Sequence, residues 1–420
     1  MSHYTRNKKT KYGVLFFLLV FLATVASVYV FDIPLDGLKN RASVFFIDSI
    51  TEKSLLEDFA KAKSGQGKIK ILIVPGHDNK LGGTKFNGVR EYELNIELAE
   101  NLTKMLRKEP GFEVTLTRNK YNYNENIQKY ISKNYQEIKT FRAKHKDIMD
   151  SLVRSGLVDT RKGVEHNNAP TKTAIRLYGI NKWANENNFD IVLHIHFNDY
   201  PGRKYNKPGK YSGITVYIPE KQFSNAKASK ALAKTVFKRL IRYSASSDLP
   251  IENTGIVEDQ ELIAVGSYNT LDPAVLLVEY GYIYEPQITN PKTRTLAIKE
   301  LATQTYFGVL DFFNTTKPQK ESSYDTATLP YSWNNNLKKG FRGDKDVFAL
   351  QTALASQKLY PPKTKSKNDC PINGNFGPCT ARAVINFQKK YNIKPASGFV
   401  GPITRSKLNE FYSFSLERTL

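Results

Sequence analysis

The chain has 420 residues, so a domain of ordinary size with at least one smaller module is expected. Hydrophobic residues make up 40% of the sequence and aromatic residues 12%, which excludes a low-complexity disordered protein. The net charge of +22 fits nucleic acid, a membrane surface or an anionic polymer as partner, and it also fits a surface that lysines merely solvate. The sequence has no helix-turn-helix, RNA-binding or zinc-finger pattern, so we expect no nucleic-acid partner.

The N-terminal residues predict a membrane anchor. A run without charge extends from Gly13 to Phe31 and is long enough to span a bilayer as a helix. Basic residues precede this run, which favours a cytoplasmic tail at 1–12, an anchor in the cell membrane at 13–31, and all later residues outside the cytoplasm. The alternative is a cleaved signal peptide and a secreted protein, for which Thr24 and Ala26 offer a small-residue site.

The polar segment 32–69, with glycines at 65 and 67, predicts a stalk. A catalytic core begins after it. The apolar run 71–74 stops at Pro75 and Gly76, as a buried strand does when it ends in a loop. Helical spacing of leucines predicts a helix over 91–108, and alternation predicts a strand over 112–118. Strand, helix and strand in this order indicate a right-handed βαβ unit.

Further elements follow in the same alternating manner. They are helices over 173–187, 223–243 and 292–313 and strands over 189–197, 213–218 and 274–278. We therefore predict an α/β domain over 70–314, with a mostly parallel sheet flanked by helices. The segment 119–170 is too long for a simple connection, so it is predicted as an insertion, either a lid or substrate wall or an excursion without function.

Residues 315–335 are predicted as a linker and residues 336–413 as a small all-α bundle. The bundle contains an internal echo, because the pattern from Gly374 to Phe387 recurs from Gly398 to Phe411, each copy being a turn that opens a helix. A third helix is expected over 346–357. The two cysteines, Cys370 and Cys379, lie in this module and either form a disulfide, worth about 2 to 3 kcal/mol in an exported protein, or remain free thiols.

Chemistry-bearing residues gather at the ends of the predicted strands. His77 follows the first strand, His194 and His196 share one face of another, and Glu279 ends an apolar strand where an unpaired charge is costly. Glu91 begins the helix that follows the His77 loop. Two histidines and a glutamate are an established ligand set for catalytic zinc, and a second carboxylate can take a proton from the attacking water. The pattern fits metal-assisted hydrolysis of an amide.

These residues lie in four blocks that together resemble the zinc-dependent N-acetylmuramoyl-L-alanine amidases of bacterial cell-wall metabolism. The blocks are 74–77 (VPGH), Gly88 with 91–95 (EYELN), 194–198 (HIHFN) and 273–282 (PAVLLVEYGY). The resemblance implies Zn²⁺ as cofactor, held by His77, Glu91 and His196, and Glu279 as the catalytic residue. It further implies cleavage of the bond between the MurNAc lactyl group and L-alanine, so peptidoglycan is the expected substrate.

Some positions depart from the family pattern. His194 stands where the family usually has a small residue, so we expect it beside the metal as a substrate contact and not as a ligand. Asp78 and Asn79 replace glycines that commonly follow the first histidine, and the insertion exceeds the usual spacing. Asn198 is a second candidate for substrate binding, although capping of a strand end suits an Asn there better.

The C-terminal module resembles the peptidoglycan-binding domain that accompanies many wall hydrolases, which implies a second contact with peptidoglycan and gives the basic surplus a partner in anionic wall polymers or lipid headgroups. Two other functions stay open. A zinc peptidase acting on peptide cross-links would use the same ligand chemistry. A wall-binding scaffold with a dead metal site is the other alternative, against which Glu279 argues.

Overall fold

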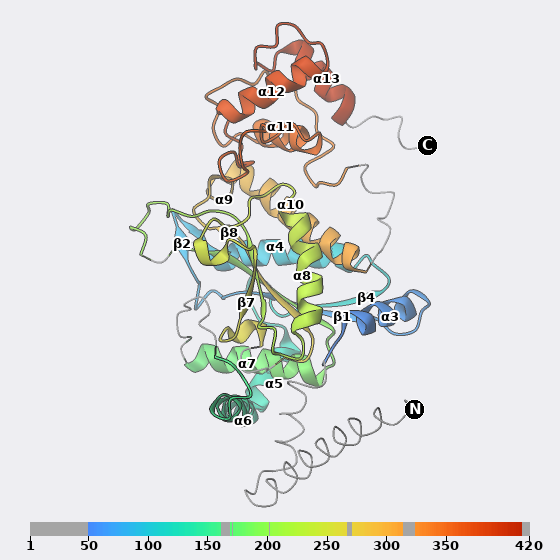
Figure 1. Cartoon of the computed structure of the whole chain (residues 1–420), viewed down its shortest axis with the longest axis vertical. Helices are drawn as coiled ribbons and strands as arrows, with labels where there is room; N and C mark the ends of the chain where they lie inside the picture. The colour runs from blue at the N-terminus through green and yellow to red at the C-terminus, as the bar shows by residue number, and fades with distance from the viewer. Residues whose placement is uncertain are drawn as a thin grey trace, which may run out of the picture.

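The computed structural model describes residues 49–160, 169, 171–200, 202–266, 271–313 and 324–413. Within these ranges an α/β domain is followed by a domain of three helices (Figure 1). Among the helices of the described residues, none is both long and apolar enough to cross a membrane. The predicted tail at 1–12 and anchor at 13–31 lie outside the described residues.

A six-stranded sheet in the order β4-β1-β5-β8-β6-β7 forms the centre of the α/β domain. Its strands are β1 (Ile69–Pro75), β4 (Phe112–Leu116), β5 (Ile191–Asn198), β6 (Thr215–Pro219), β7 (Ile256–Asp259) and β8 (Ala274–Tyr282). All neighbouring strands pair in parallel except β6 and β8, so the prediction of a mostly parallel sheet is confirmed. The carboxyl ends of β1, β5 and β8 consequently meet at one edge.

Helices cover both faces of the sheet, which is why its central strands read as unbroken apolar runs. One face packs against α4 (Glu91–Leu106), α8 (Ala226–Leu240) and α10 (Pro291–Phe312). The other face packs against α5 (Glu125–Lys133) and α7 (Thr171–Glu186) (Figure 1). The shorter elements are the hairpin of β2 (Lys85–Phe86) and β3 (Val89–Arg90), and α9 (Pro286–Thr289).

The predicted stalk at 32–69 contains a docked helix, α3 (Glu52–Lys63). Thr51 caps its first turn, and Leu55 and Phe59 are buried against the main core. Gly65 and Gly67, both at positive φ, follow this helix and mark its end. The part of the predicted stalk that precedes Ser49 lies outside the described residues.

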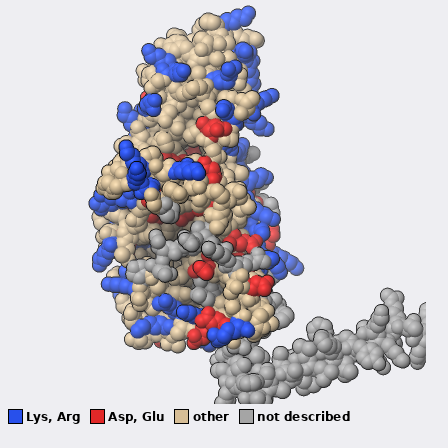
Figure 2. Space-filling model, turned by 60° about the vertical axis from the view of Figure 1, so that its left-hand side comes forward, with Lys and Arg blue, Asp and Glu red and all other residues tan. Residues whose placement is uncertain are grey.

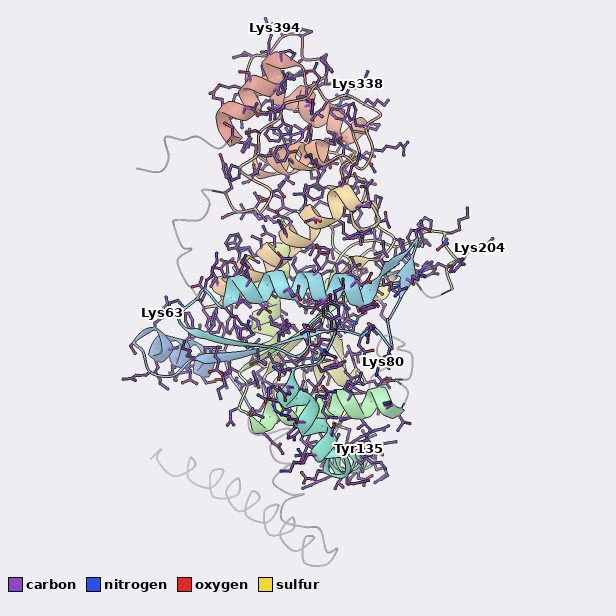
Figure 3. All side chains as sticks on the ribbon, turned by 180° about the vertical axis from the view of Figure 1, so that it is seen from behind. Lys63, Lys80, Tyr135, Lys204, Lys338 and Lys394 are labelled. Carbon is purple, nitrogen blue, oxygen red and sulfur yellow. A yellow bond between two sulfur atoms is a disulfide. The ribbon has the colours of Figure 1, made fainter. Side chains whose placement is uncertain are left out.

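The insertion at 119–170 is largely helical where it is described, with α5 followed by α6 (Tyr135–Arg154). Its sequence pattern is weak because few of its side chains are buried; Ile138, Met149 and Leu152 are the buried ones on α6. The helices pack against α7 at the end of the molecule remote from the C-terminal domain, as the positions of Tyr135 and Lys394 show (Figure 3).

The C-terminal domain consists of α11 (Lys345–Ser356), α12 (Pro378–Lys390) and α13 (Pro402–Tyr412). The internal echo has a structural counterpart, since a buried glutamine on the preceding helix donates to each repeated threonine: Gln351 to Thr380 at 2.9 Å and Gln388 to Thr404 at 3.0 Å. A disulfide joins Cys370 and Cys379.

The segment predicted as a linker, 315–335, is not a free spacer over its described part. Trp333 is completely buried in the core of the C-terminal domain, so that packed domain begins before residue 336. The segment also contacts the α/β domain. Buried Glu300 on α10 accepts hydrogen bonds from the Thr326 and Thr328 hydroxyls and from the amide of Ala327.

A second contact between the two domains comes from the loop that ends at Cys370. Lys367 donates to the carbonyl of Ile241, and Asn368 donates to the carbonyl of Ser246 at 3.0 Å. The C-terminal domain is therefore fastened to the α/β domain at two separate places.

Candidate active site

The ends of β1 and β5 bring two histidines together. Pro75 at the end of β1 is in register with Ile195 on β5, so His77 and His196 follow at the same edge of the sheet. Their ring centroids lie 5.1 Å apart. The ring of His196 crosses the backbone at Gly76 so closely that a Cβ there would lie 2.1 Å from its Cε1 atom, which explains the glycine before His77.

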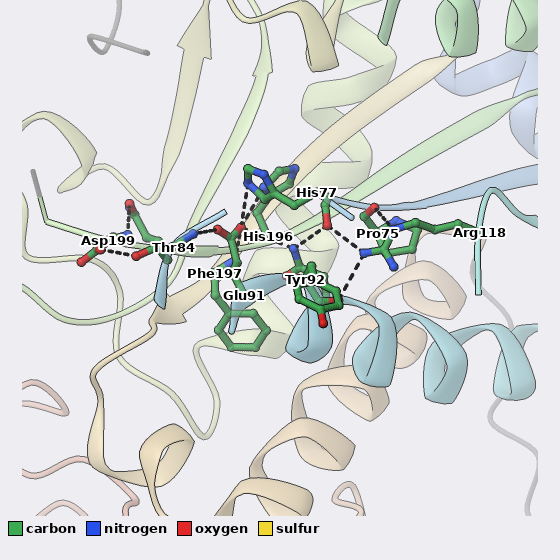
Figure 4. Close-up of polar contacts among 12 residues, drawn as sticks. Pro75, His77, Thr84, Glu91, Tyr92, Arg118, His196, Phe197 and Asp199 are labelled. Atoms are coloured by element: carbon green, nitrogen blue, oxygen red, sulfur yellow. Dashed lines mark hydrogen bonds and ion pairs between the residues drawn. The ribbon is translucent and has the colours of Figure 1, made fainter. Parts of the chain in front are cut away.

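Glu91 reaches the two histidines from the first residue of α4 (Figure 4). Its Oε1 atom lies 3.3 Å from His77 Nε2 and 3.1 Å from His196 Nδ1. Its Oε2 atom accepts a hydrogen bond of 3.0 Å from the amide of Thr84. Gly83 has a φ of +66°, and a Cβ there would lie 2.3 Å from this same oxygen, so the loop between β1 and β2 can wrap the carboxylate only with glycine at this position.

Two imidazole nitrogens and a carboxylate oxygen are the donor types that zinc takes in catalytic sites. The three ligand atoms of His77, Glu91 and His196 lie within 4.8 Å of one another. Ligands about 2.0 to 2.2 Å from a tetrahedral zinc ion are separated by about 3.3 to 3.6 Å, and the two distances measured from Glu91, 3.3 and 3.1 Å, lie at or just below the lower end of this range. These residues therefore fit a zinc ion, with the partly exposed His77 on the solvent side.

Two of the three groups favour the charge state that a cation needs, whereas, against the effect of burial, Glu91 raises the pKa of His77 above its ordinary value. Burial acts to raise the pKa of Glu91, but hydrogen bonds with His196 and His77 outweigh it, and the pKa is lowered. Burial lowers the pKa of His196, although Glu91 opposes the shift. An ionised carboxylate and a neutral imidazole are the protonation states in which these groups bind a metal.

Glu279 lies beside the cluster without belonging to it. Its Cα is in register with that of His196 across β5 and β8, so both side chains lie on the same face of the sheet. Burial, together with the charges of Glu91 and Glu252, raises the pKa of Glu279 well above its ordinary value. Its Oε2 atom has no hydrogen-bond partner among the described residues.

The two predicted substrate contacts are placed differently from each other. His194 is buried under the site, its Nε2 atom has no partner among the described residues, and burial with the charge of His196 lowers its pKa to about 3. Asn198 is engaged at both ends of its amide, donating to Glu252 at 3.0 Å and accepting from the Asp199 amide at 2.8 Å. A role in substrate binding stays a prediction for both residues.

Several residues of the site were not found from the sequence. The Thr84 hydroxyl donates to Asp199, so the loop between β1 and β2 is tied to the end of β5 (Figure 4). Asp199 in turn accepts two hydrogen bonds from Arg203, at 2.6 and 3.0 Å. The one sequence signal that points to Asp199 is its position three residues after His196. Contacts between loops so distant in the chain leave no periodic signal.

A mostly parallel α/β fold thus brings His77, Glu91 and His196 together in a cluster that could hold a metal ion. The family model described as N-acetylmuramoyl-L-alanine amidase matches residues 71–310, more than half of the chain, so the protein belongs to this family of amidases. A model described as a peptidoglycan binding domain matches residues 343–408.

This chain is also similar to several solved structures. The N-acetylmuramoyl-L-alanine amidase from Clostridium difficile 630 is 20% identical, with 60% of this chain and 100% of that chain covered and a TM-score of 0.38. AmiC2 of Nostoc punctiforme is 16% identical, with 59% and 99% covered and a TM-score of 0.36. Ami1 from Mycobacterium smegmatis is 14% identical, with 60% and 99% covered and a TM-score of 0.39. The search of curated proteins found no match.

Proposed function

We propose that this amidase hydrolyses the bond between the lactyl group of MurNAc and the L-alanine of the stem peptide, with zinc held by His77, Glu91 and His196. Membership of the amidase family supports the reaction. The convergence of the three ligand atoms within 4.8 Å is the observation that carries the metal site. Zinc in such a site lowers the pKa of a bound water to about 7 and polarises a carbonyl oxygen.

Glu279 is the general base of the proposed reaction. Its Cα is in register with that of His196, and its buried Oε2 atom forms no hydrogen bond with a described residue, so this oxygen keeps an unused acceptor site for the water of the proposed reaction. As a carboxylate it accepts a proton from the attacking water and then donates that proton to the leaving amine of L-alanine. Its burial excludes bulk water as a competing partner for the same oxygen.

Digestion of purified peptidoglycan by the zinc-loaded enzyme tests this reaction, with identification of the new chain ends by mass spectrometry. We expect stem peptides with a free L-alanine amine and glycan strands with a free lactyl carboxylate. New ends at the peptide cross-links, with the MurNAc-peptide bond intact, would instead identify a peptidase. Binding to the wall without any new ends would identify a scaffold.

We also propose that the enzyme works outside the cytoplasm, tethered to the membrane by residues 13–31. The disulfide of Cys370 and Cys379 supports export, since such bonds persist in oxidising compartments. Lys and Arg side chains occur over both domains on the face shown in Figure 2, which suits an anionic wall. Protease added to intact cells should digest the full-length protein, and a product that begins near Ser27 would show cleavage of the anchor.

A further inference from the structure

His77 adopts a backbone conformation that must be held by its surroundings. Its φ is +59°, in the left-handed region that residues with a side chain rarely occupy. The residue follows a strand and precedes a loop, and its side chain is the most exposed of the three proposed ligands, at 35%. Packing of neighbouring side chains therefore restrains the His77 ring less than it restrains the Glu91 side chain.

Arg118 holds the chain immediately before His77. This arginine is buried, and its guanidinium group donates to the carbonyl of Pro75 at 3.2 Å and to that of Gly76 at 2.9 Å. A third hydrogen bond of 3.2 Å goes to the carbonyl of Tyr92, next to the ligand Glu91 (Figure 4). One side chain thus connects the backbones beside two of the three proposed ligands.

Asp78 holds the chain immediately after His77. Its Oδ1 atom accepts the amides of Lys80 and Leu81 at 2.9 and 2.8 Å, which closes a turn. Its Oδ2 atom forms an ion pair with Arg176 on α7 and lies 3.4 Å from the hydroxyl of Tyr123. The Arg176 guanidinium also lies over the Tyr123 ring, 4.7 Å from its centroid.

Arg118 and Tyr123 belong to one tight turn at the start of the insertion. They pair with each other as an antiparallel bridge, and the Asn119 amide donates to the Asn122 carbonyl at 2.9 Å. The Asn124 amide donates to the Thr117 carbonyl, and the Asn124 side chain then caps α5. The same turn therefore contacts the His77 loop on both sides of the histidine.

We propose that Arg118, Tyr123, Arg176 and Asp78, which we name the His77 clamp, are positioning residues for this metal ligand. The proposal rests on the proposed zinc site. It gives the first part of the insertion a function: this part holds the loop that carries His77 in place. Groups that orient ligands in this way typically change metal affinity tenfold to a hundredfold when they are lost.

The test uses full-length protein with the substitutions Tyr123→Phe, Arg176→Gln and Asp78→Asn, and the double variant Asp78→Asn/Arg176→Gln. Zinc affinity is measured by competition with a chromogenic chelator, and the melting temperature is measured without metal. The control is Arg142→Gln in the same insertion, where the guanidinium lies over the Tyr178 ring at 5.6 Å and outside the clamp. Tyr123→Phe removes one hydroxyl only and keeps the ring that Arg176 covers.

We expect Arg176→Gln and Asp78→Asn to bind zinc roughly tenfold to a hundredfold more weakly, and Tyr123→Phe to show a smaller loss in the same direction. The double variant should bind zinc no more weakly than the single variant with the lower zinc affinity, because both substitutions break the same ion pair. At saturating zinc, kcat should fall while the KM for wall fragments stays constant. The control should match the wild type in all three measurements.

Zinc affinity equal to that of the wild type in all clamp variants would overturn the proposal, and so would independent, additive losses in the double variant. A lower melting temperature without any change in zinc affinity would reduce the clamp to a stabilising contact and overturn it as well. A wild-type protein that binds no zinc would contradict the proposed function itself, which keeps the two failures distinct.

Discussion

His196 and Glu279 lie opposite each other on the neighbouring parallel strands β5 and β8. Two residues earlier on the same strands, His194 lies opposite Leu277. Both histidines lie on the same face of β5, but only the one nearer the strand end reaches the ligand cluster. The sheet thus places a proposed ligand and a proposed base side by side at its edge, with His194 and Leu277 in the row beneath them.

Replacement of the proposed base, Glu279→Gln, should lower kcat on peptidoglycan by about 10²- to 10⁴-fold. The amide has nearly the same shape but cannot accept the proton of the attacking water, so zinc content and wall binding should remain near the wild-type values. An assay of newly freed L-alanine amines measures kcat, and metal analysis measures the zinc content. Activity within a factor of about two of the wild type would remove Glu279 from the mechanism.

The two histidines of β5 should respond in opposite ways to substitution. His196→Ala removes a nitrogen that lies 3.1 Å from Glu91, so bound zinc should fall far below one ion per chain. His194→Ala should keep its zinc and lose stability, since it leaves a cavity below the site. Metal analysis combined with thermal unfolding separates the two effects. Loss of zinc in both variants would make His194 a fourth ligand.

Gly83→Ala should impair the site through shape alone. The added Cβ would lie 2.3 Å from Glu91 Oε2 and 2.7 Å from the His77 ring at a positive φ, which should cost about 1 to 3 kcal/mol of stability and weaken zinc binding. Gly82→Ala is the matched control, since its Cβ meets nothing nearer than Tyr92 Cδ1 at 3.4 Å. Chemical unfolding and zinc titration of both variants check the contrast. Equal behaviour would contradict the steric argument.

The contact between the domains should depend on pH through Glu300. Burial raises the pKa of this carboxyl above the ordinary 4.5, although hydrogen bonds from Thr326, Gln304, Thr328 and Ala327 oppose the shift. The folded state therefore holds the proton more tightly, so stability falls as the pH rises from about 4.5 through the raised pKa.

The side chain of Glu300→Gln does not titrate. As the pH rises over the same range, the free energy of unfolding of this variant should therefore increase relative to that of the wild type. Urea unfolding of both proteins at several pH values measures the difference in free energy of unfolding. A difference that stays constant with pH, or that changes in the opposite direction, would contradict the raised pKa.

The sheet could be predicted because its strands are buried on both faces. Unbroken apolar runs marked β1 and β8, and the parallel topology then required His77, His196 and Glu279 to meet at one edge. Glu91 followed from its place at the start of the helix after the first strand. For these residues local pattern and topology agree.

The remaining contacts could not be predicted, for physical reasons. Helix α6 consists mainly of polar residues and buries few side chains, so its narrow apolar stripe is easily missed in the sequence. Asp78, noted in the sequence only as a departure from the family pattern, finds its ionic partner Arg176 98 residues further along the chain. A pair of that kind depends on where a loop and a helix come to lie, and no spacing within a short window records it.

The two-point attachment of the C-terminal domain, through Glu300 and through the loop of Lys367, has a consequence for how the enzyme meets its polymer. With wall material held by that domain, the scissile bond must arrive at a set offset from the point of capture. The distance between the C-terminal domain and the active site is then fixed. Among bonds of the same chemistry, we expect the enzyme to cleave those that lie at this distance from the wall material held by the C-terminal domain.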